Sequence, residues 1–472
     1  MIAPLAALAG LVLLTGAGAG LIGLLRSPEA SDADPPHVGW CFLAGTALAG
    51  LLLHVPLAID GRIPRSAFLF VLGLGLVLAA GPGRALVRSV GVTRFLGRDL
   101  LRALPPWLRV VAVLLVLLAA AASLGPFAGW DERAIYGLKA RVLYHEGSVH
   151  AEAFADTAYV HSQSRYPLLV PLLEATLFTL RGSFDDRGLR LLFLLFSLSL
   201  ALVVAGEARR LHGARAGGLW GLLLLTTPML IGSSEGSGLT GSADVPLAAF
   251  VTGATVLAGR SLQRTDSGAP LLAGLLLGAA FATKQEGMIW ALALGGAVLL
   301  TLWRFPVART ADLARGAAAA AAPALLFLAL SLAASRWTPR SAWSERYEVV
   351  LRLDWLRRLG ARPAGIAPFV LRQLADWKSW GWVWVLVVAG LLFLRRPRIG
   401  RTPFFWRTTI LAVFAADLAV FAVTPNQVHW HLATAFPRLL LHLLPLATLV
   451  LAEQVGASGW PGRAPAEAEA TP

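Results

Sequence analysis

The sequence predicts an all-α, polytopic integral membrane protein, and three observations lead to this fold class. Hydrophobic residues make up 57% of the 472 residues, and charged residues make up only 14%. The mean hydropathy is +0.67, whereas a soluble domain carries about 25% charged residues. Apolar runs of roughly 15 to 22 residues, long enough to cross a bilayer as a helix, recur along the whole chain.

The apolar runs predict about thirteen transmembrane helices. We place them at residues 4–25, 38–58, 66–82, 107–128, 189–206, 216–231, 244–259, 269–283, 288–303, 316–335, 380–394, 404–423 and 438–453. The first ten residues contain no basic residue, so we expect no cleaved signal peptide and an N-terminus outside the cytoplasm. The single cysteine, Cys41, lies in an apolar run and excludes an intramolecular disulfide.

The basic residues orient these helices. Residues 84–109 hold six arginines, and shorter basic loops lie near residues 209–215, 304–315 and 395–401. An external N-terminus and the spans above bring all four segments to the cytoplasmic side, as the positive-inside rule requires. The net charge of +14 is therefore attributed to membrane topology and headgroup contacts, and nucleic-acid binding is not expected. We expect a multi-pass protein of the inner (plasma) membrane.

One apolar segment does not fit this alternation. Residues 166–180, YPLLVPLLEATLFTL, could be taken as a further span, but that span would move every later basic loop to the outside. Pro167, Pro171 and Glu174 suit a helix that lies at the membrane interface better than one that crosses it. We therefore place this helix on the outer surface, inside a long external loop.

The resulting organisation has four parts. Residues 1–100 form additional N-terminal helices, and residues 101–303 form a module with the external loop 129–188. Residues 304–453 form a C-terminal module with the external loop 336–379, whose alternating Arg and Trp residues suit an amphipathic interfacial helix, although nucleic-acid and sugar binding use similar mixtures. Residues 454–472 are expected to be a disordered cytoplasmic tail.

Three carboxylates gather at the predicted outer ends of helices. Asp131 and Glu132 follow the span that ends near residue 128, and Asp244 opens another span from the same side. Solvation alone would explain an exposed acid at a helix end. However, Trp130 is an interfacial anchor type, and Lys139 lies among the donors that follow. Converging acids at such a surface can act as a general base or as ligands of a metal or sugar.

Two external cations stand against the expected charge bias. Lys284 lies with Glu286 in the turn FATKQEGMIW, at or just above membrane depth, where ionisable residues are costly and usually functional. A lysine that snorkels and pairs with Glu286 is the alternative. Arg438 opens the last predicted span after an external loop over residues 424–438. The nearby His431 is expected to pack or form hydrogen bonds at the interface rather than bind a metal.

These segments together resemble the GT-C superfamily of membrane glycosyltransferases, in the branch of protein O-mannosyltransferases and lipid A aminoarabinose transferases. WDERAIYGLKARVLY resembles the acidic first external loop of that branch, and YPLLVPLLEATLFTLRG resembles its jaw helix. GSADVPLAAF resembles the second acidic position, GAAFATKQEG the lysine-containing helix pair, and WHLATAFPRLLLHLLPL a closing segment of bacterial members. The resemblance covers roughly residues 107–453, and the three spans before residue 100 depart from it.

The resemblance implies transfer of a sugar from a polyprenyl-phosphate monosaccharide to a glycan, lipid or protein acceptor, with inversion. Asp131, Glu132 and Asp244 would be catalytic, with Asp131 as the base. Lys284, Arg438 and Arg165 would bind the donor phosphate, supported by Lys139, Glu286 and His431. A divalent metal ion remains an option at Glu132 and Asp244. The alternative function is a transporter or flippase of the same lipids, but we find no internal repeat of the kind that transporters show.

Overall fold

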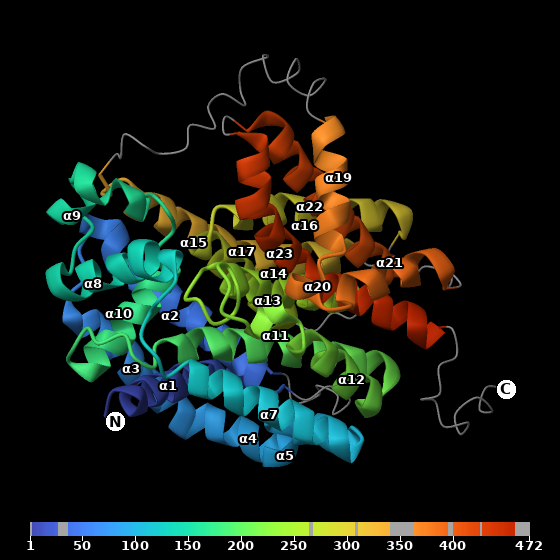
Figure 1. The fold of residues 1–472 in the computed structure, drawn as a ribbon. Coiled ribbons are helices and arrows are strands. Elements are labelled where there is room, and N and C mark those ends of the chain that lie inside the picture. Colours follow the sequence, from blue (N-terminus) through green and yellow to red (C-terminus); the bar gives the residue numbers. More distant parts are fainter. Residues whose placement is uncertain are drawn as a thin grey trace.

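The protein is a bundle of helices in the computed structural model (Figure 1). The structure describes residues 2–26, 36–263, 268–306, 310–339, 363–394, 400–424 and 427–457. Among these residues, the one extended pairing is an isolated bridge between Arg62 and Ser148. The predicted all-α class is confirmed.

Within the described residues up to Ala122, the chain forms seven α-helices and a π-helical turn. Their bounds are α1 (Ile2–Leu25), α2 (Val38–Asp60), α3 (Arg65–Leu78), η1 (Ala79–Gly83), α4 (Arg84–Val90), α5 (Val92–Phe95), α6 (Arg98–Ala103) and α7 (Pro106–Ala122). Helices α1 and α2 approach closely because small residues face each other. A Cβ atom on Gly18 or on Gly45 would lie 1.8 Å from a carbonyl oxygen of the other helix, so these positions admit only glycine.

Short helices follow α7 and form the predicted external loop. They are η2 (Asp131–Tyr136), α8 (Gly137–Glu146), α9 (Glu152–Ala155), η3 (Thr157–Ser162) and α10 (Leu169–Arg181). The second half of the bundle comprises α11 (Arg190–His212), α12 (Ala214–Leu225), α13 (Pro228–Ile231), α14 (Asp244–Ser261), α15 (Gly268–Thr283), α16 (Glu286–Arg304), α17 (Thr310–Ser335), α19 (Pro363–Leu374), α20 (Trp377–Trp380), α21 (Val383–Phe393), α22 (Arg401–Val423) and α23 (Val428–Ala457).

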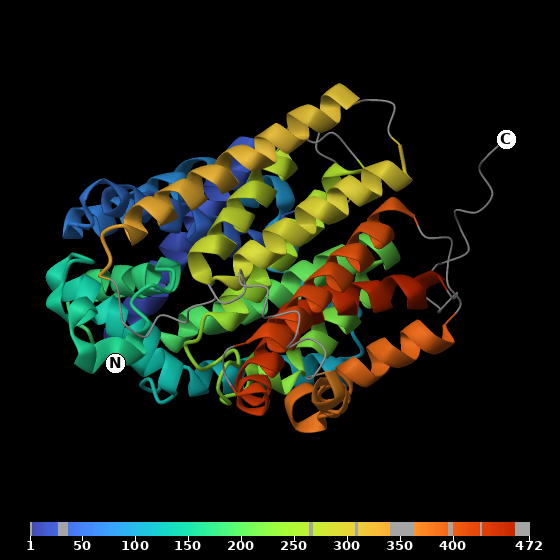
Figure 2. The ribbon, with the colours of Figure 1, turned by 90° about the horizontal axis from the view of Figure 1, so that it is seen from above.

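Each predicted span overlaps at least one of these helices, and the longest helices run side by side through the molecule (Figure 2). The predicted span 66–82 overlaps both α3 and η1, and the predicted span 216–231 overlaps both α12 and α13. Within the described residues, eight helices are long and apolar enough to cross a membrane. Shorter apolar helices, among them α7, α12, α15 and α21, fill the positions of other predicted spans. A multi-pass membrane protein is therefore supported, whereas the number of crossings stays a prediction.

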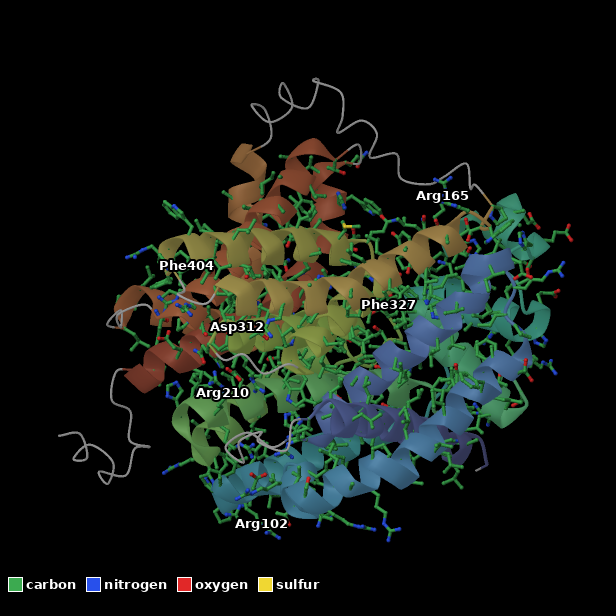
Figure 3. All side chains as sticks on the ribbon, turned by 180° about the vertical axis from the view of Figure 1, so that it is seen from behind. Arg102, Arg165, Arg210, Asp312, Phe327 and Phe404 are labelled. Carbon is green, nitrogen blue, oxygen red and sulfur yellow. The ribbon has the colours of Figure 1, made fainter. Side chains whose placement is uncertain are left out.

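The contacts define two ends of the bundle. At one end, Asp244 at the start of α14 pairs with Lys284 in the α15–α16 turn and with Arg438 in the N-terminal part of α23. We call this the site end. At the other end, Arg260 at the end of α14 pairs with Glu207 of α11, and Arg401 of α22 donates to the carbonyl oxygen of Leu262. We call it the basic end. In Figure 3, Arg165 lies far from Arg102 and Arg210, in line with the alternation that the arginines predict.

Helix α10 occupies residues that we predicted to lie at the outer membrane interface, and the structure adds that it is packed inside the protein. Ten of its thirteen residues are buried, against α8 and the N-terminal helices. Glu174 is fully buried, neither of its oxygens has a partner within the described part of the chain, and burial raises its pKa well above the ordinary value. The segment is mostly apolar, so burial of its whole circumference outweighs the cost of one neutral carboxyl group.

Both ends of α10 are nevertheless held by α8. Just before α10, the carbonyl oxygen of Gln163 accepts a hydrogen bond from Lys139 of α8 at 2.6 Å. Just after α10, Asp186 pairs with Arg141 of α8 at 2.9 Å. Helix α8 is only ten residues long, so the segments before and after α10 lie beside the same short helix. This arrangement supports an α10 that does not cross the membrane.

Two further boundaries differ from the prediction. The expected loop over residues 424–438 is helical from Val428, because Leu432 and Phe436 are fully buried one turn apart and extend the apolar face of α23. The apolar helix expected over residues 107–128 ends at Ala122. Most of the Arg- and Trp-rich loop 336–379 (residues 340–362), as well as residues 458–472 of the tail, lies outside the described residues.

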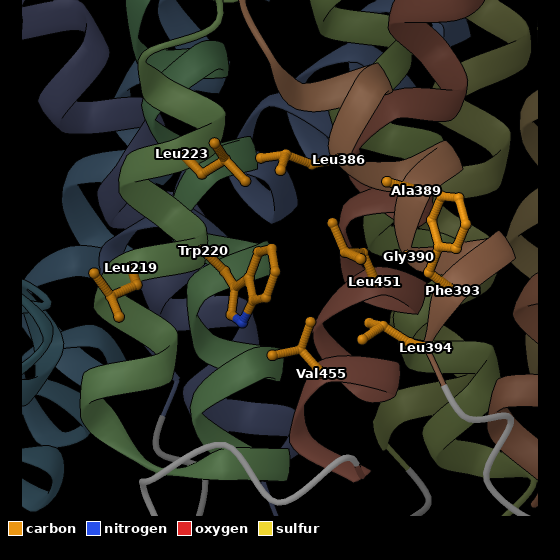
Figure 4. A pocket seen from close by; sticks show the side chains of 10 residues that line it. All are labelled: Leu219, Trp220, Leu223, Leu386, Ala389, Gly390, Phe393, Leu394, Leu451 and Val455. Carbon is orange, nitrogen blue, oxygen red and sulfur yellow. The ribbon is translucent and has the colours of Figure 1, made fainter.

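An apolar cavity of about 530 Å³ lies between α12, α21 and α23 (Figure 4). Leu219, Trp220 and Leu223 line it from α12, and Leu451 and Val455 line it from α23. Since α23 also carries Arg438, one helix connects this cavity with the site end.

Cysteine labelling checks the orientation. In a Cys41→Ala background, we expect Glu152→Cys to react with an impermeant thiol reagent added outside intact cells and Arg215→Cys to stay unlabelled. Both positions are exposed at the surface, Glu152 in α9 and Arg215 at the start of α12. External labelling of Arg215→Cys would mean that α10 crosses the membrane.

Candidate active site

Asp131 begins a π-helical turn whose first amide groups are capped from far along the chain. The Glu235 carboxylate accepts hydrogen bonds from the backbone N–H of Trp130 at 3.2 Å and of Asp131 at 3.1 Å. These N–H groups have no partner within their own helix, because they stand at its start. A distant acidic side chain thereby fixes the backbone that carries Asp131.

Arg438 joins two of the predicted acids. Its guanidinium donates to Oδ2 of Asp244, from Nε at 2.8 Å and from the terminal nitrogen at 2.6 Å, and the same terminal nitrogen also contacts Oδ2 of Asp131. Asp244 is fully buried and Asp131 is 7% exposed. A shared guanidinium offsets the strong repulsion that two nearby buried carboxylates would otherwise have.

Lys284 completes the coordination of Asp244. Its ammonium lies 2.8 Å from Oδ1 of Asp244 and 2.8 Å from Oε1 of Glu286. His442 Nε2 is 3.4 Å from the same Asp244 oxygen. Both oxygens of Asp244 are therefore engaged by cations or by the imidazole, and Asp244 acts as the centre of the cluster. The predicted pairing of Lys284 with Glu286 is present together with the contact to Asp244.

The two oxygens of Asp131 differ. Oδ2 faces Arg438, whereas Oδ1 forms no hydrogen bond or ion pair with any residue that the structure describes. Asp131 also keeps some contact with solvent. Of the three predicted catalytic acids, Asp131 alone has an oxygen that can receive a proton from a molecule bound at the site.

Glu132 is used to hold the turn before Asp131. One oxygen accepts from the backbone N–H of Gly129 at 2.6 Å and of Ala128, and Arg190 pairs with both oxygens, at 3.0 Å for its Nε. Glu132 is fully buried. A carboxylate whose two oxygens both have partners is held in one place, which suits a positioning role.

A glycine-rich loop over residues 232–243 wraps around these side chains. At Gly236, with φ +81°, an added Cβ would lie 2.8 Å from Cγ of Arg438. At Gly241, with φ +60°, it would lie 2.5 Å from Cβ of Glu132. The left-handed backbone and the missing side chains both require glycine. The Gly- and Ser-rich sequence of this loop is thus explained by its close contact with the site.

Of the three predicted supporting residues, Glu286 contacts Lys284 in the cluster, whereas Lys139 and His431 lie outside it. Lys139 is fully buried, donates to Gln163 and lies with its ammonium 5.4 Å from the ring centre of Tyr166, and burial lowers its pKa to about 7. His431 lies 2.8 Å from the Thr424 hydroxyl and packs edge-on against a phenylalanine ring. Neither touches the acids in the described contacts.

Arg165 is exposed and forms no ion pair with the residues that the structure describes. It follows the segment in which His161 packs on Trp130, with ring centres 5.8 Å apart. Arg165 therefore lies close in sequence to a contact with the residue before Asp131. The described residues include no group of three or more His, Cys, Asp or Glu that could hold a metal ion.

Sequence reasoning missed three residues of the site, namely Arg190, Glu235 and His442. Arg190 begins a span at the predicted outer side, against the charge bias, just as Arg438 does, and this signal could have identified it. Glu235 stands in a Gly- and Ser-rich loop, where an acid is ordinary. His442 lies in an apolar helix, where an ionisable residue indicates function.

Comparison with known families bears on the class of enzyme. The family model described as dolichyl-phosphate-mannose-protein mannosyltransferase matches residues 165–337. The match supports a GT-C superfamily glycosyltransferase, as the sequence motifs predict. It includes Asp244, Lys284 and Glu286, whereas Asp131 and Arg438 lie outside it. The searches of curated proteins and of solved structures found no match.

Removal of Arg438 tests the shared ion pair. We expect Arg438→Met to destabilise the protein by about 3 to 5 kcal/mol, because it leaves two buried carboxylates without their common partner. Combining it with Asp244→Asn should cost less than the sum of the two single changes. The measurement is thermal unfolding in detergent. Strict additivity would contradict the pairing.

Proposed function

We propose that this membrane glycosyltransferase moves a sugar from a polyprenyl-phosphate monosaccharide to an acceptor hydroxyl on the extracytoplasmic face. The family match supports the class of enzyme. The observation that carries the catalytic assignment is the free oxygen of Asp131, at the end of the bundle opposite the basic loops.

In the proposed reaction, Asp131 Oδ1 takes the proton of the acceptor hydroxyl. The acceptor oxygen then bonds to the anomeric carbon as the bond from that carbon to the phosphate oxygen breaks, with inversion. Polyprenyl phosphate leaves as an anion, so neighbouring cations stabilise the charge that develops. Asp244 and Glu132 position the reacting groups, since their own oxygens are already occupied.

Lys284, Arg438 and Arg165 are the proposed donor-phosphate ligands. Asp131, Asp244 and Glu286 already balance Lys284 and Arg438, with three carboxylates against two cations. An anionic phosphate therefore needs a further positive charge at the site. Arg165 can supply it, because it is exposed and forms no ion pair within the described residues.

The prenyl tail requires apolar surface within reach of a phosphate bound at the site. The cavity between α12, α21 and α23 provides it, since every side chain that lines this cavity is aliphatic or aromatic. Leu451 lies about 20 Å along α23 from Arg438 at 1.5 Å per residue. A long isoprenoid chain whose phosphate lies near Arg438 could reach this cavity through the bilayer.

Asp131→Asn tests the base. We expect transfer to fall by roughly 10²- to 10⁴-fold, because the amide cannot accept the proton, while donor binding persists. The measurement is sugar release from labelled polyprenyl-phosphate mannose with a panel of glycan, lipid and peptide acceptors. Glu152→Gln, an exposed acid in α9, is the matched control. Full activity of Asp131→Asn would exclude Asp131 as the base.

Lys284→Gln tests the phosphate site. We expect KM for the donor to rise by about 10-fold or more, as for loss of a charged hydrogen bond, with KM for the acceptor unchanged. Lys378→Gln, an exposed lysine in α20, is the control. Lys284 and Arg438 both contact Asp244. Non-additive effects of the two substitutions on activity could therefore arise from Asp244 alone and would not prove a shared phosphate. The informative measurement is whether KM for the donor changes more than KM for the acceptor. A change confined to acceptor KM would refute the assignment.

A further inference from the structure

A second, polar cavity lies at the opposite end of the short helical rod η2–α8 from Asp131. Its volume is about 590 Å³, within the usual range for small-molecule sites. Its walls are the turn between α2 and α3 and the last turn of α8. The side chains that matter for ligand chemistry are Asp60, Arg62, Arg65, Tyr144, His145 and Glu146.

Backbone hydrogen bonds join the two walls. The N–H of Ile63 donates to the carbonyl of Gly147 at 2.7 Å, and the N–H of Val149 donates to Gly61 at 2.9 Å. Gly61 and Gly147 have φ values of +72° and +59°, and an added Cβ on either would clash with the facing chain. The close approach of the two segments therefore depends on glycine at both positions.

Two side chains reinforce the joint. His150 Nε2 lies 2.9 Å from the carbonyl oxygen of Asp60, and the Trp337 indole N–H donates to the carbonyl of Ala58 at 3.3 Å. The cavity is thus held by α2, α8 and the end of α17 together. A ligand would meet walls that are already in place, which lowers the entropy cost of binding.

The cavity is lined by equal numbers of carboxylates and guanidinium groups, and these groups form no ion pairs with one another. Two carboxylates, Asp60 and Glu146, face two guanidinium groups, Arg62 and Arg65. None of the four forms an ion pair with any residue that the structure describes. An anionic ligand would meet both carboxylates, and a cation would meet both arginines. Hydroxyl groups both donate and accept, so a neutral polyhydroxylated ligand satisfies all four.

Two side chains that line the cavity, Tyr144 and His145, are aromatic. His145 packs edge-on against Tyr144 and against Phe184, with ring centres 5.0 Å apart in each case, and Arg65 lies over the Tyr144 ring at 5.3 Å. The exposed imidazole of His145 offers the C–H face of a sugar a ring surface, and the charged groups beside it offer partners for the hydroxyls.

We propose that this cavity binds a sugar unit of a carbohydrate acceptor, away from the point of transfer. The statement that the bound sugar belongs to the acceptor rests on the proposed function. The binding of a sugar to this cavity does not depend on it. Glu146 lies fifteen residues after Asp131, or about 20 Å along a helix at 1.5 Å per residue. The additional N-terminal helices, which depart from the family pattern, would then contribute one wall of an acceptor subsite.

Saturation-transfer NMR on the full-length protein tests this binding directly. The probes are mannobiose and cellobiose, with inorganic phosphate and phosphoethanolamine to represent lipid headgroups, in a detergent that has no sugar headgroup. We expect at least one disaccharide to give a signal in the wild type. Glu146→Gln and Arg62→Gln should weaken that binding by about 10-fold or more, and Glu152→Gln should leave it unchanged.

Gly61→Ala, checked for folding by thermal unfolding, should also remove disaccharide binding although it keeps every charge. Asp131→Asn should retain it, so a failure of the catalytic assignment is distinguishable from a failure of this subsite. The proposal is overturned if neither disaccharide binds, if binding is unaffected by Glu146→Gln and Arg62→Gln, or if the cavity variants alter only the binding of phosphate or phosphoethanolamine.

Discussion

The site end of the molecule depends on one guanidinium that two carboxylates share. Arg438 lies 307 residues after Asp131 and 194 residues after Asp244, and it contacts both. In a mostly apolar bundle, each of these acids alone would carry a heavy desolvation cost. The helices that bring them together are therefore constrained by charge as well as by packing.

This constraint accounts for the surrounding backbone. The π-helical turn that starts at Asp131 is capped by Glu235, and the preceding residues are held by Glu132. The loop that supplies Glu235 approaches so closely that Gly236 and Gly241 have no room for side chains. The acids, the loop and the arginine are thus linked by direct contacts, and each of them helps to fix the position of Asp131.

Hydropathy was enough to predict the fold class and the positions of the apolar helices along the chain, whereas the side of the membrane that each helix end faces stays a prediction from charge bias. Hydropathy and charge bias could not predict that α10 is buried, because the proline and glutamate that suggest an interface say nothing about neighbouring helices. Site residues such as Asp131 and Arg438 were predicted one at a time from their unusual position at helix ends. Their partners could not be, since an ion pair across hundreds of residues leaves no periodic signal in a single sequence.

The sharing of Arg438 has a consequence for the order of events. The guanidinium contacts Oδ2 of Asp131 and Oδ2 of Asp244 at the same time. In the proposed function, a donor phosphate that drew Arg438 toward itself would loosen both contacts. The side chain of Asp131 would then be released from the arginine only after the donor had arrived, so donor binding would precede the positioning of the acceptor hydroxyl.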